Sequence, residues 1–485
     1  MRRSQHLLKK SWEKIVNYSE KSWEKIVNYS EKSWEKIVIY TAWVISFIML
    51  KRKITDLFLK WKNTSDKNCL LVKGARQVGK TFIIDDFARK NYGNYIYINF
   101  EMMPGMKDVF DGDLDVDTLV RSLSIRFPKV KFEPGNILIF FDEIQSCPNA
   151  RVSLKSFSVD GRFDVICSGS LLGLNYKEVS SYPVGYETVL ELPSLDFEEF
   201  LWALGISDDN ISYISDTIRK KEPIGNSILS KMNEYYRWYT LVGGMPKAVN
   251  KFMESNNFGE VLAVQQDIIS GYLDDISKYA PESDKSRIRN ILKSIPVQLG
   301  KSNKKFQYSD IIGWEPGSGS KIYGNGILWL HDAGIVNYCY NLQEPAAPLV
   351  SNIKFNSFKI YMKDTGLLMS MMEPGVRIAV SDGDLKINQG GVAENITADI
   401  LSKKGISPMY FERKGKLEVD FVMNLDGNVT ALEVKSGNNR QSKSLDVLMS
   451  EKYGLKRGIK LENTNVCVDN KGVEHYPLFA VSFLF

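Results

Sequence analysis

The residues whose types and spacing most clearly indicate chemistry form a glycine-rich loop. The loop has the pattern G-x-x-x-x-G-K-[ST] and consists of Gly74, Ala75, Arg76, Gln77, Val78, Gly79, Lys80 and Thr81. In such a loop the backbone N–H groups surround a phosphate, the Lys80 ammonium reaches the terminal phosphates, and the Thr81 hydroxyl coordinates Mg2+. An apolar run precedes the loop and a helical pattern follows it, so a helix N-terminus also faces the anion. This context predicts a nucleoside triphosphate site rather than a chance turn.

Two adjacent carboxylates provide the second half of the predicted site. Asp142 and Glu143 end an apolar run that begins at Ile137, as expected of a buried parallel strand whose C-terminal end meets a ligand. Asp142 is placed to hold Mg2+, directly or through water, and Glu143 to orient and polarise the attacking water. A buried strand with a solvated acidic end is the competing interpretation, and the upstream loop favours the site.

Five apolar runs in the first 200 residues predict the strands that position these groups. The runs span residues 69–73, 95–100, 137–142, 163–168 and 187–192, with helical patterns between most of them. Such alternation predicts an α/β fold with a parallel, doubly wound sheet. Because the C-terminal ends of parallel strands meet at one edge, we expect Lys80, Asp142 and Ser168 to gather there.

Composition and charge limit the kinds of protein that this chain can be. Its 485 residues suit roughly two to four domains, and 44% apolar with 25% charged residues is ordinary for a globular protein. The five cysteines form no C-x-x-C pair, which indicates a reducing compartment without structural zinc, and three histidines argue against histidine-based metal catalysis.

Residues 1–48 carry nine Lys and Arg against five Glu, so the rest of the chain is nearly neutral. Nucleic-acid binding would therefore rest on local patches.

An eleven-residue unit occurs three times near the N-terminus, beginning at Ser11, Ser22 and Ser33. This period predicts one apolar stripe of Trp, Ile and Val along a helix, and a recent tandem duplication explains the near-identity better than packing does. The apolar run 37–50 that follows is short for a membrane span, which leaves an interfacial helix or marginal anchor as an expectation. A physiological start at Met49 is a further expectation, so residues 1–48 are not assumed to belong to the native protein.

The sequence beyond the first 200 residues divides into helical and mixed regions. Residues 208–280 have helical patterns broken at Gly243–Pro246, which suits either a lid on the nucleotide or an interdomain scaffold. Residues 285–340 read as helix, turn, helix and short strands. Lysines 301, 304, 305 and 321 lie near the turns, and either phosphate contacts of a winged helix or solvated lysines on a protein-binding module would account for them.

Several motifs occur together in a specific order. They are the phosphate loop, Ile98–Glu101, Phe141–Gln145, Ser168–Ser170, Leu195–Phe200, Val242–Pro246, Phe358–Leu367 and Glu433–Gly437. In this order and spacing, from about Met49 to the end, the chain resembles the large prokaryotic family of AAA-type ATPases fused to a C-terminal domain of unknown function. The resemblance implies an AAA-like core, a helical bundle, a winged-helix-like segment and a nuclease-like C-terminal domain.

The resemblance also bears on single residues. In such ATPases a polar residue on the strand beside the acidic one senses the terminal phosphate, and Ser168 or Ser170 would fit that role; a turn of small residues is the other interpretation. Many relatives carry arginine after the glycine at position 185, where this chain has Tyr186. We therefore expect an arginine finger, if one is used, to come from elsewhere.

A second set of charged residues lies in the C-terminal region. Asp420 lies within one short strand pattern, residues 418–422, and Glu433 and Lys435 follow on the next strand as Glu-x-Lys, which is the layout of the restriction-endonuclease-like fold. Strand alternation places Glu433 and Lys435 on one face, where Asp420 and Glu433 could share a divalent ion beside Lys435. Glu394 resembles the acidic residue that precedes this core. A fold kept for packing or binding remains an equal alternative to a working nuclease.

These observations lead to one predicted organisation. The segments are 1–48 (N-terminal extension), 49–207 (AAA-like core), 208–284 (helical lid or bundle), 285–342 (winged-helix-like) and 343–485 (restriction-endonuclease-like). We expect a cytoplasmic ATPase that acts as a switch or motor with ATP and Mg2+, and we keep two alternatives: an ATP-gated metal-dependent nuclease, and a non-enzymatic DNA- or protein-binding scaffold. DNA, protein partners, further copies of the chain and membrane contact through residues 37–50 are the candidate partners.

Overall fold

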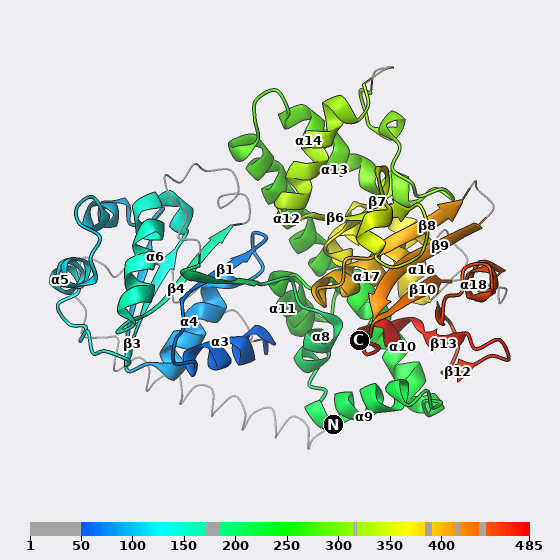
Figure 1. Cartoon of the computed structure of the whole chain (residues 1–485), viewed down its shortest axis with the longest axis horizontal. Coiled ribbons are helices and arrows are strands. Elements are labelled where there is room, and N and C mark those ends of the chain that lie inside the picture. The colour runs from blue at the N-terminus through cyan, green and yellow to red at the C-terminus, as the bar shows by residue number, and fades with distance from the viewer. Residues whose placement is uncertain are drawn as a thin grey trace. The chain divides into compact units, whose positions relative to one another are not determined.

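The computed structural model describes residues 50–170, 185–314, 316, 318–383, 390–413, 417–435 and 443–485, which fold around two β-sheets (Figure 1). The described residues belong to one compact unit, Leu50–Phe485. The N-terminal repeats and most of the apolar run 37–50 lie outside the described residues.

The first sheet carries the phosphate loop and consists of five parallel strands in the order β2-β3-β4-β1-β5. This order confirms the predicted parallel α/β sheet. It also places β4 between the strand that leads into the loop and the strand that ends in Asp142. The strands are β1 (Cys69–Gly74), β2 (Asn94–Asn99), β3 (Ile137–Asp142), β4 (Asp164–Ser170) and β5 (Glu187–Glu191).

Helices cover both faces of this sheet because successive strand residues point to opposite sides. Leu70 and Val72 of β1 pack into one core, whereas Leu71 between them packs into another. The first core includes α3 (Ile54–Lys62) and α4 (Lys80–Asn91), and the second includes α5 (Val116–Arg126) and α6 (Pro148–Asp160) (Figure 1). Burial on both faces explains why all six residues of β3 are buried.

A run of helices follows the first sheet, where the sequence predicts helices. The helix α8 begins with a capping box in which Asp196 and Glu199 satisfy each other's backbone N–H groups. The longest, α12, follows the Asn257 cap and buries one face along its whole length. The helices are α8 (Phe197–Ala203), α9 (Asp208–Arg219), α10 (Asn226–Val242), α11 (Pro246–Ser255) and α12 (Phe258–Tyr279).

The second sheet has eight strands of mixed direction in the order β12-β13-β11-β10-β9-β8-β6-β7. It follows α13 (Lys285–Leu299) and α14 (Ser320–Asp332). The strands β6 and β7 pair antiparallel although the predicted boundary at residue 342 falls between them, so the sheet continues across that boundary. The strands are β6 (Val336–Leu342), β7 (Ile353–Met362), β8 (Met409–Arg413), β9 (Leu417–Leu425), β10 (Asn428–Val434), β11 (Arg457–Glu462), β12 (Cys467–Val468) and β13 (Glu474–Pro477).

One helix lies at the centre of this C-terminal α/β region. In α17 (Gly390–Lys403) every residue from Gly391 to Leu401 is buried, which is the pattern of a helix covered on all sides. It contacts β6, β7 and β10 and the 3-10 turn Leu478–Ser482 near the end of the chain. The other helices of the region are α15 (Thr365–Met371), α16 (Pro374–Asp382) and α18 (Lys443–Met449).

The turn at Gly243 and Gly244 joins the first sheet, the helices and the C-terminal region. Gly244 N donates to Asp364 Oδ2 at 2.8 Å, and Gly244 O accepts from Leu195 N at 2.7 Å. A Cβ at Gly244 would lie 2.0 Å from Leu195 O, and Gly243 has φ +71°, so larger residues are excluded at both positions. Lys403 completes this joint by donating to Leu195 O at 3.1 Å. The break predicted at Gly243–Pro246 is therefore a junction between parts of the fold.

Candidate functional site

The phosphate loop runs from the end of β1 to the start of α4. Its backbone needs two left-handed residues, Gln77 (φ +67°) and Gly79 (φ +93°). Residues larger than glycine are excluded at position 74, because a Cβ on Gly74 would lie 2.4 Å from Leu192 O. The predicted helix N-terminus is present, since α4 begins at Lys80. The glycines therefore allow the backbone to turn sharply into the positive end of α4, as a phosphate-binding loop requires.

The Lys80 side chain lies inside this loop. Its Nζ donates to Gly74 O at 3.0 Å and to Ala75 O at 2.9 Å, and the residue is 8% exposed. Burial lowers the pKa of Lys80, while the carboxylates of Glu143 and Asp142 oppose that change. Weak carbonyl partners and a desolvated charge make Lys80 ready to exchange these contacts for phosphate oxygens.

Asp142 is the centre of a hydrogen-bond network at the carboxyl edge of the sheet. It is 2% exposed and accepts bonds from four side chains and from its own neighbour's backbone. The donors are Ser168 Oγ, Thr81 Oγ1 (3.1 Å), Tyr97 OH (2.9 Å), Asn99 Nδ2 (3.0 Å) and Glu143 N (3.1 Å). The structure thus brings together Asp142 and Ser168, two of the three residues predicted to share this edge, and adds Thr81 of the phosphate loop. The hydroxyl of Thr81 and the carboxylate of Asp142 are the hard oxygen donors that Mg2+ requires, so the residues fit that ion.

Two members of this network, Tyr97 and Asn99, were not predicted as site residues. Both lie on β2, which pairs with β3 so that Asn99 stands opposite Asp142. Asn99 also accepts the backbone N–H groups of Glu101 and Met102 at 3.0 and 2.9 Å, which fixes its amide. The alternation of polar residues at 97 and 99 was the available signal, since it marks one face of a strand that is otherwise apolar.

Glu143 adopts a left-handed backbone conformation directly after β3, with φ +52° and ψ +47°. Such a conformation is strained for a residue other than glycine, and strain of this kind concentrates at functional sites. The Glu143 carboxylate accepts a bond from Gln145 Nε2. Burial and the neighbouring Asp142 raise the pKa of Glu143, and the Gln145 bond and the Lys80 charge counteract them. A carboxylate with a raised pKa, held beside the phosphate loop, has the properties of a general base.

One face of α12 lies against the phosphate loop. Asp275 forms an ion pair with Arg76 of the loop, and Lys278, one turn further, lies 3.8 Å from Glu101 Oε1. Gly271, one turn earlier, leaves room for Gln77, whose Nε2 is 3.4 Å from where a Cβ would be. These spacings of four and three residues place all three positions on the same side of the helix. The helical region therefore touches the loop directly, through residues that the sequence did not single out.

Arg52 connects the phosphate loop to the segment that leads into α8. Its guanidinium donates to Val78 O at 3.2 Å and to Pro193 O at 2.6 Å, and its Nε lies 3.1 Å from Glu199 Oε1. Both charged side chains are 5% exposed. The residues just after Met49 are thus tied to the loop and to the capping box of α8.

The four residues of the predicted C-terminal site lie near one another, together with two lysines. Glu394 and Asp420 both approach the buried Lys359, at 3.3 and 4.0 Å from its Nζ, and Glu394 also pairs with Lys304 at 2.8 Å. Lys435 pairs with its neighbour Glu433 at 2.7 Å. Burial and the Glu394 charge raise the pKa of Asp420 to about 7. Burial opposes the ionisation of Glu394, but Lys359 and Lys304 overcome it and lower its pKa to about 2.

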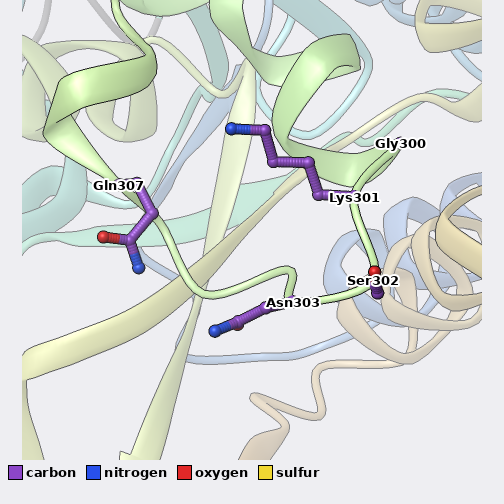
Figure 2. Close-up of a pocket in the computed structure, with 5 residues that line it drawn as sticks. All are labelled: Gly300, Lys301, Ser302, Asn303 and Gln307. Atoms are coloured by element: carbon purple, nitrogen blue, oxygen red, sulfur yellow. The ribbon is translucent and has the colours of Figure 1, made fainter.

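The loop after α13 is the other place where the sequence suggested contacts, in that case with nucleic acid. A hollow of about 440 Å³ is lined there by Gly300, Lys301, Ser302, Asn303 and Gln307 (Figure 2). Lys301 pairs with Asp310 at 2.5 Å, and Lys304 pairs with Glu394. Two of the four lysines considered for phosphate contacts are thus neutralised within the protein. Contact with DNA through this loop stays a prediction.

Metal-binding clusters and membrane-spanning helices are both absent from the described residues. No group of three or more His, Cys, Asp or Glu side chains is arranged there to hold a metal ion. No helix in the same part of the chain combines the length and the apolar character needed to cross a membrane.

Comparison with protein families supports part of this picture. Residues 66–201 match the AAA domain family, and residues 233–377 and 389–479 match two domains of unknown function, DUF8612 and DUF4143. The first match contains the phosphate loop, Asp142 and Glu143. The chain therefore carries an AAA-type domain with the P-loop ATPase fold, followed by two domains of unknown function. The restriction-endonuclease-like nature of the last domain stays a prediction.

Individual relatives are distant. The uncharacterized protein MJ1544 of Methanocaldococcus jannaschii is 25% identical over 403 residues, which cover 82% of this chain and 80% of that protein. Among solved structures, the chain is similar to the Walker-type ATPase paby2304 of Pyrococcus abyssi (14% identity, 67% of this chain and 96% of that one, TM-score 0.39). It is also similar to the Aeropyrum pernix ORC1 protein in complex with DNA (12% identity, 70% and 93%, TM-score 0.29). At these TM-scores neither structure bears on the function of this chain.

Proposed function

We propose that this protein binds Mg-ATP at the phosphate loop and hydrolyses it, and that α12 transmits the nucleotide state to the rest of the chain. The observation that carries the proposal is the convergence of Thr81 and Ser168 on Asp142, beside Glu143 and the buried Lys80. When bound, Mg2+ would neutralise charge on the β- and γ-phosphates. Thr81 and Asp142 are the residues that would hold it.

Each residue then has a defined task. Lys80 exchanges its two carbonyl partners for terminal phosphate oxygens, and the backbone N–H groups of the loop surround the β-phosphate. Glu143 accepts a hydrogen bond from water and orients it toward the γ-phosphorus. The new P–O bond forms as the bond to the β–γ bridging oxygen breaks, and a proton of the attacking water passes to the Glu143 carboxylate, which yields ADP and phosphate. Ser168 keeps Asp142 in place through its hydrogen bond, and we assign to it the sensing of a γ-phosphate oxygen.

The contact between α12 and the loop supports the switch or motor role. Phosphates entering the loop meet Arg76, which is already paired with Asp275 of α12. A ligand that attracts Arg76 weakens that pair, so α12 responds to what the loop contains. The joint at Gly243 and Gly244 connects α10 and α11 to Asp364 of the C-terminal region, which provides the onward route.

Two variants test the proposal. Lys80→Ala is expected to abolish binding of a fluorescent ATP analogue, because it removes the buried ammonium group that we assign to the terminal phosphates. Glu143→Gln is expected to bind ATP normally but to release phosphate at a rate reduced by about a hundredfold or more. Lys90→Ala, an exposed lysine on the same helix α4, is the matched control and should behave as the unmodified protein. Normal phosphate release by Glu143→Gln would disprove the role given to that carboxylate.

A further inference from the structure

Lys359 lies at the centre of the C-terminal carboxylates although it comes from a distant strand. It belongs to β7 at one edge of the second sheet and is 1% exposed. Its Nζ lies 5.0 Å from the centre of the Tyr410 ring of β8, so the side chain passes over that ring toward β9. There it meets Glu418 Oε1 at 2.9 Å and Asp420 Oδ1 at 4.0 Å, and Glu394 Oε2 of α17 at 3.3 Å. The Lys359 ammonium group therefore lies within ion-pair distance of three carboxylates.

The remaining oxygens of Glu394 and Asp420 are also engaged. Lys304 lies 2.8 Å from Glu394 Oε1, and Tyr361 OH donates to Glu394 Oε2 at 2.8 Å. Asp420 Oδ2 accepts from Val434 N at 2.8 Å. Three of the four carboxylate oxygens of Glu394 and Asp420 thus have a partner within the protein at 2.8–3.3 Å, and the fourth, Asp420 Oδ1, lies 4.0 Å from the Lys359 ammonium.

A divalent metal does not fit this arrangement. An ion shared by Glu394 and Asp420 would need ligand oxygens at about 2.0–2.6 Å. It would then lie within a few ångströms of the Lys359 ammonium, in a buried site where repulsion between like charges is weakly screened. The ammonium already supplies the positive charge that such an ion would bring.

We propose that Lys359 is the resident cation of this cluster, so that Glu394, Glu418 and Asp420 are held together by protein ammonium groups and the C-terminal domain does not act as a metal-dependent nuclease. The inference does not depend on ATP hydrolysis. It departs from the expectation that Asp420 and Glu433 share a metal ion.

The cluster also has a structural role, because its charges come from opposite sides of a family boundary. Lys304 and Lys359 fall within residues 233–377, and the three carboxylates fall within residues 389–479. The cations of one matched segment thus neutralise the anions of the other. Loss of the Lys359 ammonium would leave Lys304 as the cation that pairs with Glu394 and would take from the buried Asp420 a nearby positive charge, which would loosen this contact.

Glu433 carries the one buried carboxylate oxygen of the predicted C-terminal site residues that has no hydrogen-bond partner among the described residues. Its Oε1 pairs with Lys435, whereas the oxygen without a hydrogen-bond partner there is Oε2. A metal would have to enter at this oxygen, so the test includes Glu433→Gln.

The first experiment is calorimetric titration of Mn2+ into the full-length protein without nucleotide. The unmodified protein, Asp420→Asn and Glu433→Gln are expected to give the same isotherm, since none binds Mn2+ at the C-terminal cluster. Binding by the unmodified protein that either variant removes would overturn the proposal. Cleavage of single- or double-stranded DNA or RNA that needs Mn2+ and is lost in Asp420→Asn would overturn it as well.

The second experiment removes the Lys359 ammonium, so that a metal ion can take its place among the carboxylates. Lys359→Met keeps the length of the side chain but removes its charge, and is expected to lower the midpoint of thermal unfolding, which Mn2+ should then restore by binding the folded state. Lys359→Met/Asp420→Asn should lose that response to Mn2+. A Lys359→Met protein with the original midpoint, or one that is destabilised but indifferent to Mn2+, would contradict the cation role. If Lys359→Met does not fold, the calorimetric titration of the unmodified protein with Mn2+ tests the proposal by itself.

Discussion

Arg76 of the phosphate loop and Asp275 of α12 form an ion pair although they are 199 positions apart in the chain. The Asp275 side chain is 6% exposed and the Arg76 side chain 55% exposed, so the helix contributes the buried partner. Burial raises the pKa of Asp275, and the Arg76 charge acts against it. A carboxylate beside a loop built for phosphate competes with the ligand for the same cation. We therefore expect nucleotide binding at this loop to be linked to the position of α12.

This link predicts that Asp275→Asn binds nucleotide more tightly. The substitution releases Arg76 and removes a negative charge from the neighbourhood of the phosphates. Because Arg76 is more than half exposed, the pair is worth about 1 kcal/mol or less, which corresponds to a gain of up to about fivefold in affinity. Titration with a fluorescent ADP analogue measures this gain. Asp274→Asn removes an exposed carboxylate from the same helix and should leave the affinity unchanged; an equal gain there would point to general charge effects.

Separate substitutions of Ser168 and Ser170 distinguish which of the two serines senses the terminal phosphate. Ser168 is fully buried and donates to Asp142, whereas Ser170 is partly exposed. Ser168→Ala should keep ATP binding but lower kcat about tenfold to a hundredfold, because Asp142, the carboxylate proposed to hold Mg2+, loses a hydrogen-bond donor. Ser170→Ala should leave kcat within a factor of about two on the same scale. A steady-state phosphate-release assay compares them, and the reverse order would assign the sensing role to Ser170.

Gln145 should control the acid limb of the pH profile of ATP hydrolysis. Glu143 must be ionised to accept a proton from water, and its pKa is raised by burial and by Asp142. The hydrogen bond from Gln145 stabilises the ionised form and therefore lowers that pKa. Gln145→Leu removes the bond, so the rise of kcat with pH should begin at a higher pH than in the unmodified protein. An unshifted acid limb in Gln145→Leu would show that Glu143 is not the group that titrates.

Asp420 should make the free energy of unfolding decrease as pH rises. Its pKa is about 7 in the folded protein and about 4 in an unfolded chain, so between these values only the folded state keeps the proton. The free energy of unfolding should fall over this range and then level off. Urea unfolding at about pH 5 and about pH 8 should show a smaller decrease for Asp420→Asn than for the unmodified protein. Asp399, whose pKa burial also raises to about 7, is present in both proteins, so the difference between them isolates Asp420.

Arg52 should contribute strongly to stability. Arg52→Met leaves the buried Glu199 without its cation, which is expected to lower the free energy of unfolding by about 3–5 kcal/mol. Chemical denaturation measures this loss. Lys51→Met removes the neighbouring charge, whose pair with Asp208 is exposed on both sides, and should have no measurable effect. Similar losses in the two variants would mean that burial of the Arg52 pair is unimportant.

Local patterns in the sequence were enough to predict the phosphate loop and the five parallel strands. The loop motif and the apolar runs are contiguous, and their periodicity reflects burial on both faces of a sheet. The ends of β1, β2, β4 and β5 were each misplaced by one or two residues, because hydrogen bonding to the neighbouring strand decides where pairing stops. Asp142 and Ser168 were placed at one edge correctly, since parallel strands leave little choice there.

Contacts between distant segments could not be predicted in this way. Nothing near Arg76 in the sequence identifies Asp275 as its partner, and Lys359 is three strands away from Asp420 in the sheet order. Lys304 illustrates the problem, because its sequence neighbours suggested a solvated or phosphate-binding lysine. Only the folded structure shows that its charge is used by Glu394. The role assigned to a charged residue thus depended on partners that no local pattern specifies.

The joint at Gly243 and Gly244 determines how the protein can be divided for experiments. Leu195 lies within the first matched segment, Gly244 and Asp364 within the second, and Lys403 within the third. A fragment that ended near residue 201 would leave Leu195 N and O without their buried partners, at a cost of about 1–3 kcal/mol for each group, and would expose the apolar side of α8. We expect the three segments to unfold as one cooperative unit. An activity measured on an excised domain would therefore describe a different molecule from the intact chain.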